Sequence, residues 1–290
     1  MASYSAVAVM VGCYLIMFNK QAVGREAMGR PRKKDPDAKT PLDAVSAGLP
    51  DGLLKKLDQA LPKTAQVYGI MRNAIVNLHL APGSNINEKL ICEQLGISRT
   101  PLREAILQLN AENLVSVVPN SGTYVSKIDL PSVFDGQLVR DALELKVVRL
   151  AANKMTTQFE RALDFNMHQQ RRMAQDRDYD GFYELDEQFH TMICECGASL
   201  HIWKIINGAK AQLDRVRRLS IPLPSHLDVV LQEHTAVVEG LVAHDADKAE
   251  AAMKDHIERV FTMIRRHVVE RRDYFSADAA AMLDSYITGC

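Results

Sequence analysis

The strongest constraint on the fold lies in residues 63–127, where three short helical patterns precede two β-prone runs. Apolar residues recur every three or four positions in the first pattern, which is typical of an amphipathic helix. A turn at Pro82-Gly83 separates it from a second helix, expected over residues 87–95. Ser98 is the expected N-cap of the third helix.

The β-prone runs follow the third helix directly. They are Val115–Val118 and residues 123–125, with a turn containing Gly122 between them. Three short helices followed by a small hairpin predict a winged helix-turn-helix over residues 63–127.

The second half of the chain predicts an all-α bundle, so the expected fold class is mainly α. Hydrophobic residues make up 47% of the chain and aromatic residues only 6%, a mixture that favours helices over sheets. The expected helices lie near residues 131–156, 158–175, 178–195, 198–219, 226–243 and 246–272. The expected domains are an extension and linker (1–62), the winged helix-turn-helix (63–127), the bundle (131–274) and a tail (275–290).

The N-terminus predicts no membrane partner. Residues 1–18 are uncharged and mostly apolar, but they fall short of the roughly 20 residues that a spanning helix needs. Residues 1–27 are interpreted in one of two ways. Either translation begins later, with Met28 as the alternative start, or the segment is a loose extension. The basic run 29–34 fits either a minor-groove arm or a solvated charge run. Five cysteines without disulfide-framework spacing indicate a reduced, cytoplasmic protein.

The third helix carries the residues that favour DNA binding. The net charge of −1 means that any nucleic-acid surface must be a local patch. Arg99 and Arg103 are four residues apart and share a helical face, where arginine can pair with guanine or phosphate. The hydroxyls of Ser98 and Thr100 suit contacts to the DNA backbone. The alternative is a capped surface helix with incidental arginines, and the hairpin directly after it favours DNA binding.

A second group of polar residues lies in the helical half. Asp186 and His190 are four apart on one expected helix, while His234 and His256 come from two others. Together they form a nitrogen and oxygen ligand set that suits zinc, nickel, manganese or iron. The alternative is a set of unrelated histidines, each satisfied by hydrogen bonds. Spacing alone favours this alternative, because His234 and His256 lie on different expected helices and share no local sequence motif.

The first half resembles the DNA-binding domain of the GntR family. The segments LGISRTPLREAI (95–106) and PNSGTYV (119–125) carry the resemblance. It implies contacts to bases or phosphates from Arg99, Thr100 and Arg103, a phosphate contact from Lys89, and a wing tip at Gly122 that enters the minor groove. Asn113 replaces the glycine usual in the family, and asparagine also tolerates the left-handed conformation there.

Residues 131–272 resemble the FCD ligand-binding domain of the FadR subfamily within this family. The matching stretches are VRDALE (139–144), Asp186 with Phe189-His190, Glu233-His234, and Asp245 through His256. The resemblance implies that Asp186, His190, His234 and His256 bind a divalent metal. It also implies that Arg140 grips the carboxylate of a small organic acid, unless an internal ion pair with Asp186 or Glu144 engages it. Arg215 is a further candidate for effector binding.

These features together predict a transcription regulator and not an enzyme. The expected protein is a homodimeric repressor on double-stranded operator DNA, controlled by an acid effector that binds beside the metal. Release from DNA is the commoner response of such proteins, and the sequence itself does not give the sign of the response. One alternative is a regulator whose helical half only dimerises. Another is a metal-dependent enzyme, which would need a general base. Glu187 and Glu233 adjoin expected ligands in sequence, but we expect them to point off the ligand face.

Overall fold

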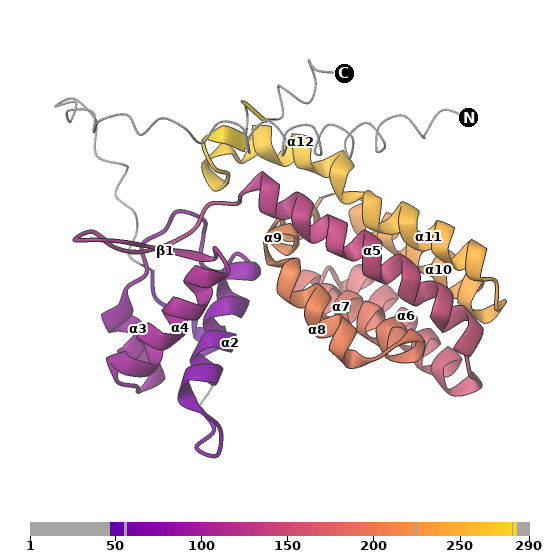
Figure 1. Ribbon diagram of the computed structural model, residues 1–290, viewed down its shortest axis with the longest axis horizontal. Helices are drawn as coiled ribbons and strands as arrows, with labels where there is room; N and C mark the ends of the chain where they lie inside the picture. Colours follow the sequence, from indigo (N-terminus) through magenta and orange to yellow (C-terminus); the bar gives the residue numbers. More distant parts are fainter. Residues whose placement is uncertain (1–46, 55–56, 224, 280, 283–290) are drawn as a thin grey trace, which may run out of the picture. The chain divides into compact units, whose positions relative to one another are not determined.

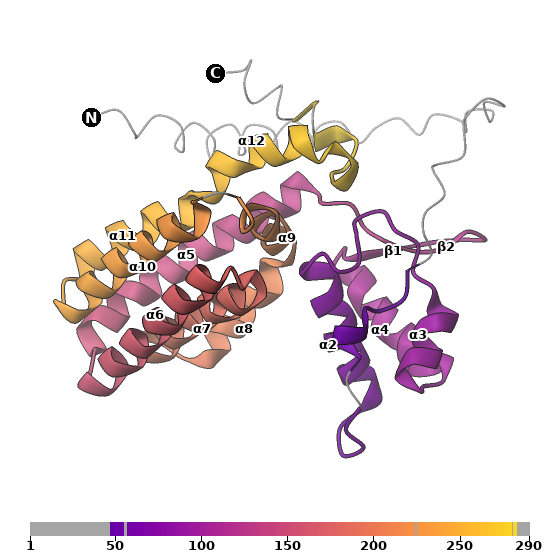
Figure 2. The same cartoon turned by 180° about the vertical axis from the view of Figure 1, so that it is seen from behind.

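The computed structural model describes residues 47–54, 57–223, 225–279 and 281–282 (Figures 1 and 2). Most of the expected N-terminal extension, the basic run 29–34 and most of the expected C-terminal tail lie outside the described residues. Among the residues described, no helix combines the length and apolar composition that a membrane crossing requires.

Three helices form the first half of the described chain: α2 (Lys63–Val76), α3 (Glu88–Leu95) and α4 (Arg99–Ala111). A 3-10 turn, η1 (Asp51–Leu53), precedes them. Helix α2 ends earlier than the Pro82-Gly83 turn, because Leu78 takes a left-handed φ of 62°. The apolar faces of the helices form a shared core, which includes Val67, Met71, Ala74, Ile75, Ile91, Leu102, Ile106 and Leu109.

The hairpin follows α4 as β1 (Val115–Val118) and β2 (Gly122–Val125), which pair antiparallel. Asn113 adopts a φ of 56° just after α4, in agreement with the left-handed conformation expected there. The sequence interpretation of Gly122 as the wing tip needs correction. Gly122 opens β2 and pairs with Val118, so the tip is the turn between the strands, where Asn120 takes a φ of 60°.

The second half is helical throughout its described residues. Its helices are α5 (Leu130–Lys154), α6 (Thr157–Asp176), α7 (Tyr179–Gly197), α8 (Leu200–Ala209), α9 (Ala211–Ser220), α10 (His226–Val242), α11 (Ala246–Glu258) and α12 (Val260–Glu270), before a final 3-10 turn η2 (Arg272–Tyr274). Helix α5 packs against α7, α8, α9 and α11, while α10 packs against α6 and α11 (Figure 1). The expected fold class, a winged helix-turn-helix followed by an all-α bundle, is confirmed.

Two of the expected helices are each broken in two. The break between α8 and α9 falls at Lys210, whose backbone approaches α5 closely. A Cβ at Gly136 would lie 3.1 Å from the Cα of Lys210, so only glycine fits there without displacement. The break between α11 and α12 falls at Arg259, whose N–H bonds the carbonyl of His256 at 3.3 Å. This three-residue spacing is the tighter 3-10 pattern, and it interrupts the α-helical ladder.

Candidate metal centre and DNA-binding surface

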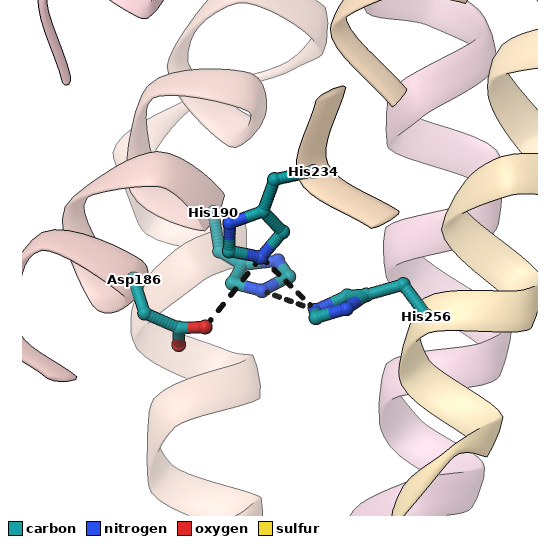
Figure 3. Close-up of side chains that lie close together, drawn as sticks. All are labelled: Asp186, His190, His234 and His256. Atoms are coloured by element: carbon teal, nitrogen blue, oxygen red, sulfur yellow. Dashed lines mark hydrogen bonds and ion pairs between the residues drawn. The ribbon is translucent and has the colours of Figure 1, made fainter. Parts of the chain in front are cut away.

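The structure brings Asp186, His190, His234 and His256 together inside the bundle (Figure 3). Asp186 and His190 leave the same face of α7, while His234 comes from α10 and His256 from α11. Each of the four residues is at most 8% exposed. One ligand atom from each lies within 4.8 Å of all the others. Side chains from three helices therefore point at one small volume.

The converging atoms have the spacing of metal ligands. His256 Nε2 lies 3.2 Å from His190 Nε2 and 3.3 Å from His234 Nε2. Asp186 Oδ1 lies 3.5 Å from His234 Nε2. Ligands about 2.1 Å from one ion and at right angles to each other lie about 3.0 Å apart. Shifts of a few tenths of an ångström would thus let these atoms share an ion.

The other ring nitrogen of each imidazole faces an acceptor from the surrounding helices. The Nδ1 atoms of His234 and His256 form hydrogen bonds of 2.8 and 3.1 Å with Gln170 Oε1 and Glu233 Oε2, whereas His190 Nδ1 lies 2.7 Å from Glu144 Oε2 without hydrogen-bond geometry. An Nδ1–H that donates to such an acceptor leaves the Nε2 lone pair free, which is the tautomer that binds a metal. Asp186 is held in the same way, because its second oxygen, Oδ2, accepts from Arg217.

The charge states of the cluster also suit a metal. Burial opposes ionisation of Asp186, but Arg217 and the neighbouring imidazoles outweigh it and hold the pKa of this carboxyl well below its usual range. Burial lowers the pKa of His234 and His256 well below the ordinary value, and neighbouring imidazoles lower it further. A carboxylate with neutral imidazoles is the form that a divalent cation requires.

A pocket adjoins this cluster. Asp186 and His256 belong to its lining, and its cavity volume is about 50 Å³. That is the space of a few water-sized groups, so the pocket suits a small ligand. The lining also includes three guanidinium groups, from Arg140, Arg217 and Arg259.

Arg140 lines this pocket, yet it is only 2% exposed and already has a partner. Its Nε donates to Glu144 Oε1 at 2.5 Å, and its Nη2 lies 3.4 Å from His190 Nε2. The internal ion pair raised as an alternative from the sequence is thus present, with Glu144 as the partner.

Arg215 does not belong to the pocket, which corrects its assignment as an effector-binding candidate. Its guanidinium donates to Gln212 Oε1 at 2.9 Å and to the Ser126 carbonyl at 2.7 Å. Burial lowers its pKa to about 9. Arg215 and Arg217 are two residues apart on α9, so they project to nearly opposite sides, and it is Arg217 that lines the pocket.

Sequence reasoning missed three pocket residues that the structure identifies: Tyr183, Arg217 and His226. Tyr183 lies three residues before Asp186, so the helical period could have placed both on one face of α7. Its buried hydroxyl has no hydrogen-bond partner among the described residues. Arg217 had no comparable signal, because its relation to Asp186 depends on how α9 packs. Glu187 and Glu233 are not among the four ligands, but Glu233 lines the pocket and lies 3.1 Å from His256 Nδ1, so the expectation that it points off the ligand face is wrong.

The residues expected to contact DNA lie on the surface of α3 and α4. Arg99, Thr100 and Arg103 are exposed, and no ion pair to a described residue engages either arginine. Ser98 occupies the N-cap position of α4, but its side chain makes no capping hydrogen bond. Lys89, on α3, has a side chain that is 79% exposed and lies 3.9 Å from Glu93. These polar groups are therefore available to an external partner.

Comparison with known families identifies the class of protein that this fold and these residues define. The model of the bacterial regulatory proteins, gntR family, matches residues 63–125, and the model of the FCD domain matches residues 137–259. The chain belongs to the FCD-containing GntR family of DNA-binding transcription regulators. Its domains are those of regulators and not of enzymes.

Individual relatives agree with this assignment. The chain is 33% identical to the HTH-type transcriptional repressor RspR of Escherichia coli K12, over 77% of this chain and 98% of RspR. It is 32% identical to an HTH-type transcriptional regulator of Streptomyces ambofaciens, over 74% of this chain and 91% of that protein. The solved structure of E. coli McbR/YncC shares the fold, with a TM-score of 0.64 at 20% identity, covering 71% of this chain and 99% of McbR/YncC.

Proposed function

We propose that this regulator binds operator DNA as a homodimer and that a small organic acid, bound at a divalent metal in the FCD domain, controls its affinity for the operator. The observation that carries the proposal is the buried convergence of Asp186 with three histidines beside a pocket. The similarity to RspR, a transcriptional repressor, supports a repressor role. Residues 63–127 would form the DNA-binding domain and residues 131–274 the sensing and dimerising domain.

The proposed DNA contacts rest on exposure and chemistry. Arg99 and Arg103 would reach bases or phosphates from the start of α4, and Ser98 and Thr100 would contact the DNA backbone. Lys89 would add a phosphate contact from α3. The wing contact falls to the turn that precedes Gly122 rather than to Gly122 itself.

The proposed metal site rests on the donor set and on its supports. Asp186, His190, His234 and His256 would hold zinc, nickel, manganese or iron, since one carboxylate and three imidazoles suit these ions. When bound, the ion supplies a Lewis acid that can take an oxygen of an organic acid. The chain's own residues orient the ligands: Glu144, Gln170 and Glu233 face the imidazole Nδ1 atoms, and Arg217 contacts Asp186.

The proposed effector position rests on the pocket beside this cluster. Tyr183 lines it with a buried hydroxyl that lacks a partner among the described residues, so a ligand oxygen could accept its hydrogen bond. Burial raises the pKa of Tyr183 well above its ordinary value, and the carboxylates of Asp214 and Glu187 raise it further. The hydroxyl is therefore a donor at neutral pH. Arg140, though paired with Glu144, lines the same pocket.

The DNA assignment is tested with Arg103→Ala and a control on the same helix. Arg103→Ala should weaken binding to a duplex from the protein's own upstream region by about 1–3 kcal/mol. Gln108→Ala changes an exposed α4 residue nearer the C-terminal end and should leave the affinity close to that of wild type. Equal affinity of Arg103→Ala and wild type, measured by fluorescence anisotropy at fixed salt, would contradict the assignment of α4.

The metal assignment is tested with the double variant His190→Ala/His256→Ala. Elemental analysis of the purified protein should find a divalent ion in wild type and none in the double variant, while binding to the duplex persists. Stoichiometric metal in the double variant would overturn the ligand assignment. A thermal-shift screen of organic acids, with and without chelator, tests the sensing role, because a genuine effector should lose its stabilising effect when the metal is removed.

A further inference from the structure

The charged groups that line the pocket are already paired. Each of the three guanidiniums contacts a carboxylate: Arg140 with Glu144, Arg217 with Asp186, and Arg259 with Glu233. Arg140 and Glu144 are both 2% exposed, and the Arg217 side chain is 14% exposed. Each of these cations therefore already has a carboxylate partner, and none is left unpaired for a ligand that enters the pocket.

A second set of charges lies behind Arg217. Lys210 is fully buried and contacts Glu187 Oε2 at 2.7 Å and Asp214 Oδ2 at 2.6 Å, and both acids also contact Arg217. The cations of both sets are Arg140, Lys210, Arg217 and Arg259, and the carboxylates are Glu144, Asp186, Glu187, Asp214 and Glu233. The carboxylates exceed the cations by one. A divalent ion among the four ligands would be the positive charge available to an acid, since the cations of both sets already have carboxylate partners.

Two nearby titratable groups add no cation to these sets. Asp141 accepts a hydrogen bond from Gln137 at 2.8 Å, and it does not line the pocket. His226 does line the pocket, and burial lowers its pKa below the ordinary value, with Arg217 acting in the same direction. His226 is thus uncharged at neutral pH, and it adds no cation for an acid.

The rest of the lining is mostly apolar. Its apolar part consists of Phe182, Ile221, Val230, Ile257, Val260 and Met263, and beside it Tyr183 and Ser220 contribute hydroxyl groups. Phe182 is 2% exposed and Ile257 1%, so this wall is largely shielded from water. Such a wall gains free energy from contact with methyl and methylene groups, whereas a hydroxyl placed against it would lose its hydrogen bonds to water.

Building on the proposed metal and effector roles, we propose that the pocket selects a monocarboxylate with a short apolar body. The acid group would lie at the metal held by the four ligands, and the body would lie against the apolar wall. A second carboxylate would be buried among guanidiniums that already have partners, and an uncompensated buried charge is costly. The same wall disfavours a polyhydroxylated acid.

The test compares three acids of equal carbon number that share a hydroxyl next to the carboxylate: α-hydroxybutyrate, malate and threonate. Malate replaces the terminal methyl with a carboxylate, and threonate adds hydroxyls. Isothermal titration of the full-length, zinc-loaded protein should give a Kd for α-hydroxybutyrate at least about tenfold lower than for either competitor. Thermal shift with the same acids gives a second readout that does not depend on DNA.

A variant tests the charge argument by gain of function. Met263 lies on the pocket wall and is half-buried, so a lysine there can keep its ammonium near solvent. Met263→Lys supplies an unpaired cation and should shift the preference towards malate by about tenfold or more relative to wild type. Met263→Leu keeps the apolar wall and should retain the wild-type order. If Met263→Lys does not fold, the comparison of acids on wild type still decides.

The possible failures are distinct. Malate binding as tightly as α-hydroxybutyrate to wild type overturns the charge argument, and threonate binding as tightly overturns the apolar one. In both cases acid sensing at the metal survives. If none of the three acids binds the zinc-loaded protein, the selectivity proposal fails. A broader acid screen that also finds no metal-dependent hit would then remove the effector role itself.

Discussion

Gln170 gives the sharpest test of how the bundle prepares the metal site. It is fully buried on α6, its Oε1 lies 2.8 Å from His234 Nδ1, and its Nε2 donates to Asn166 Oδ1 at 2.7 Å. Gln170→Met keeps a similar volume but removes both interactions. It leaves a buried N–H on His234 and a buried acceptor on Asn166 without this partner.

Both consequences can be estimated. Each buried polar group left unsatisfied costs about 1–3 kcal/mol, so the loss of two partners should lower the unfolding free energy of the metal-free protein by about 2–6 kcal/mol. Without Gln170, nothing selects the His234 tautomer whose Nε2 lone pair faces the cluster. Loss of such a supporting contact lowers metal affinity by about 10- to 100-fold.

The assay combines urea denaturation of metal-free protein with isothermal titration of zinc into folded protein. Gln188→Met is the matched control, because Gln188 is exposed on α7 only two residues from His190. It should change the unfolding free energy by less than about 0.5 kcal/mol and leave zinc affinity unaltered. If Gln170→Met binds zinc as tightly as wild type, Gln170 does not prepare His234 and the reasoning is refuted.

Three further outcomes are expected. Gly240→Val should destabilise the protein and weaken zinc binding. A Cβ at Gly240 would lie 2.6 Å from the backbone nitrogen of Ala249, so the side chain would force α10 away from α11. An unchanged melting temperature would be inconsistent with this packing. Tyr183→Phe should leave the stability of the ligand-free protein equal or higher, because it removes an unpartnered hydroxyl, yet weaken α-hydroxybutyrate binding several-fold; unchanged affinity would show that the hydroxyl does not contact the acid. Burial raises the pKa of Asp141 to about 6, so the folded state binds more protons than the unfolded state between that value and the ordinary one. The wild type should therefore gain about 1 kcal/mol of unfolding free energy relative to Asp141→Asn as the pH falls from about 7 to 5. If urea denaturation gives the same difference in unfolding free energy between the two proteins at both pH values, the prediction is refuted.

Local patterns were enough to predict most of the fold. The glycine after α3, the position of Ser98 and the β-prone runs each act over a few residues, so the helices and hairpin of the first half could be read directly. The breaks at Lys210 and Arg259 could not, because they arise from tertiary packing. Lys210 lies against α5 at Gly136 and is fixed by buried acids, which no local period reveals.

The candidate site shows the same division. Asp186 and His190 were paired by their spacing on one helix, whereas His234 and His256 joined them only through the family resemblance, since no local pattern ties α10 to α7. Arg217, and not the expected candidate Arg215, lines the pocket beside the cluster. On a helix with charges on adjacent turns, sequence alone does not say which arginine faces the core.

The central claim is that binding of metal and acid at the buried cluster controls the affinity of the protein for operator DNA. The most direct measurement is fluorescence anisotropy of the upstream duplex with zinc-loaded wild type and with His190→Ala/His256→Ala, each with and without α-hydroxybutyrate. A change in the duplex Kd of at least about tenfold on adding the acid to wild type, and none in the double variant, is the predicted result. An equal response in both proteins, or no binding of wild type to double-stranded DNA under any of these conditions, would contradict the account.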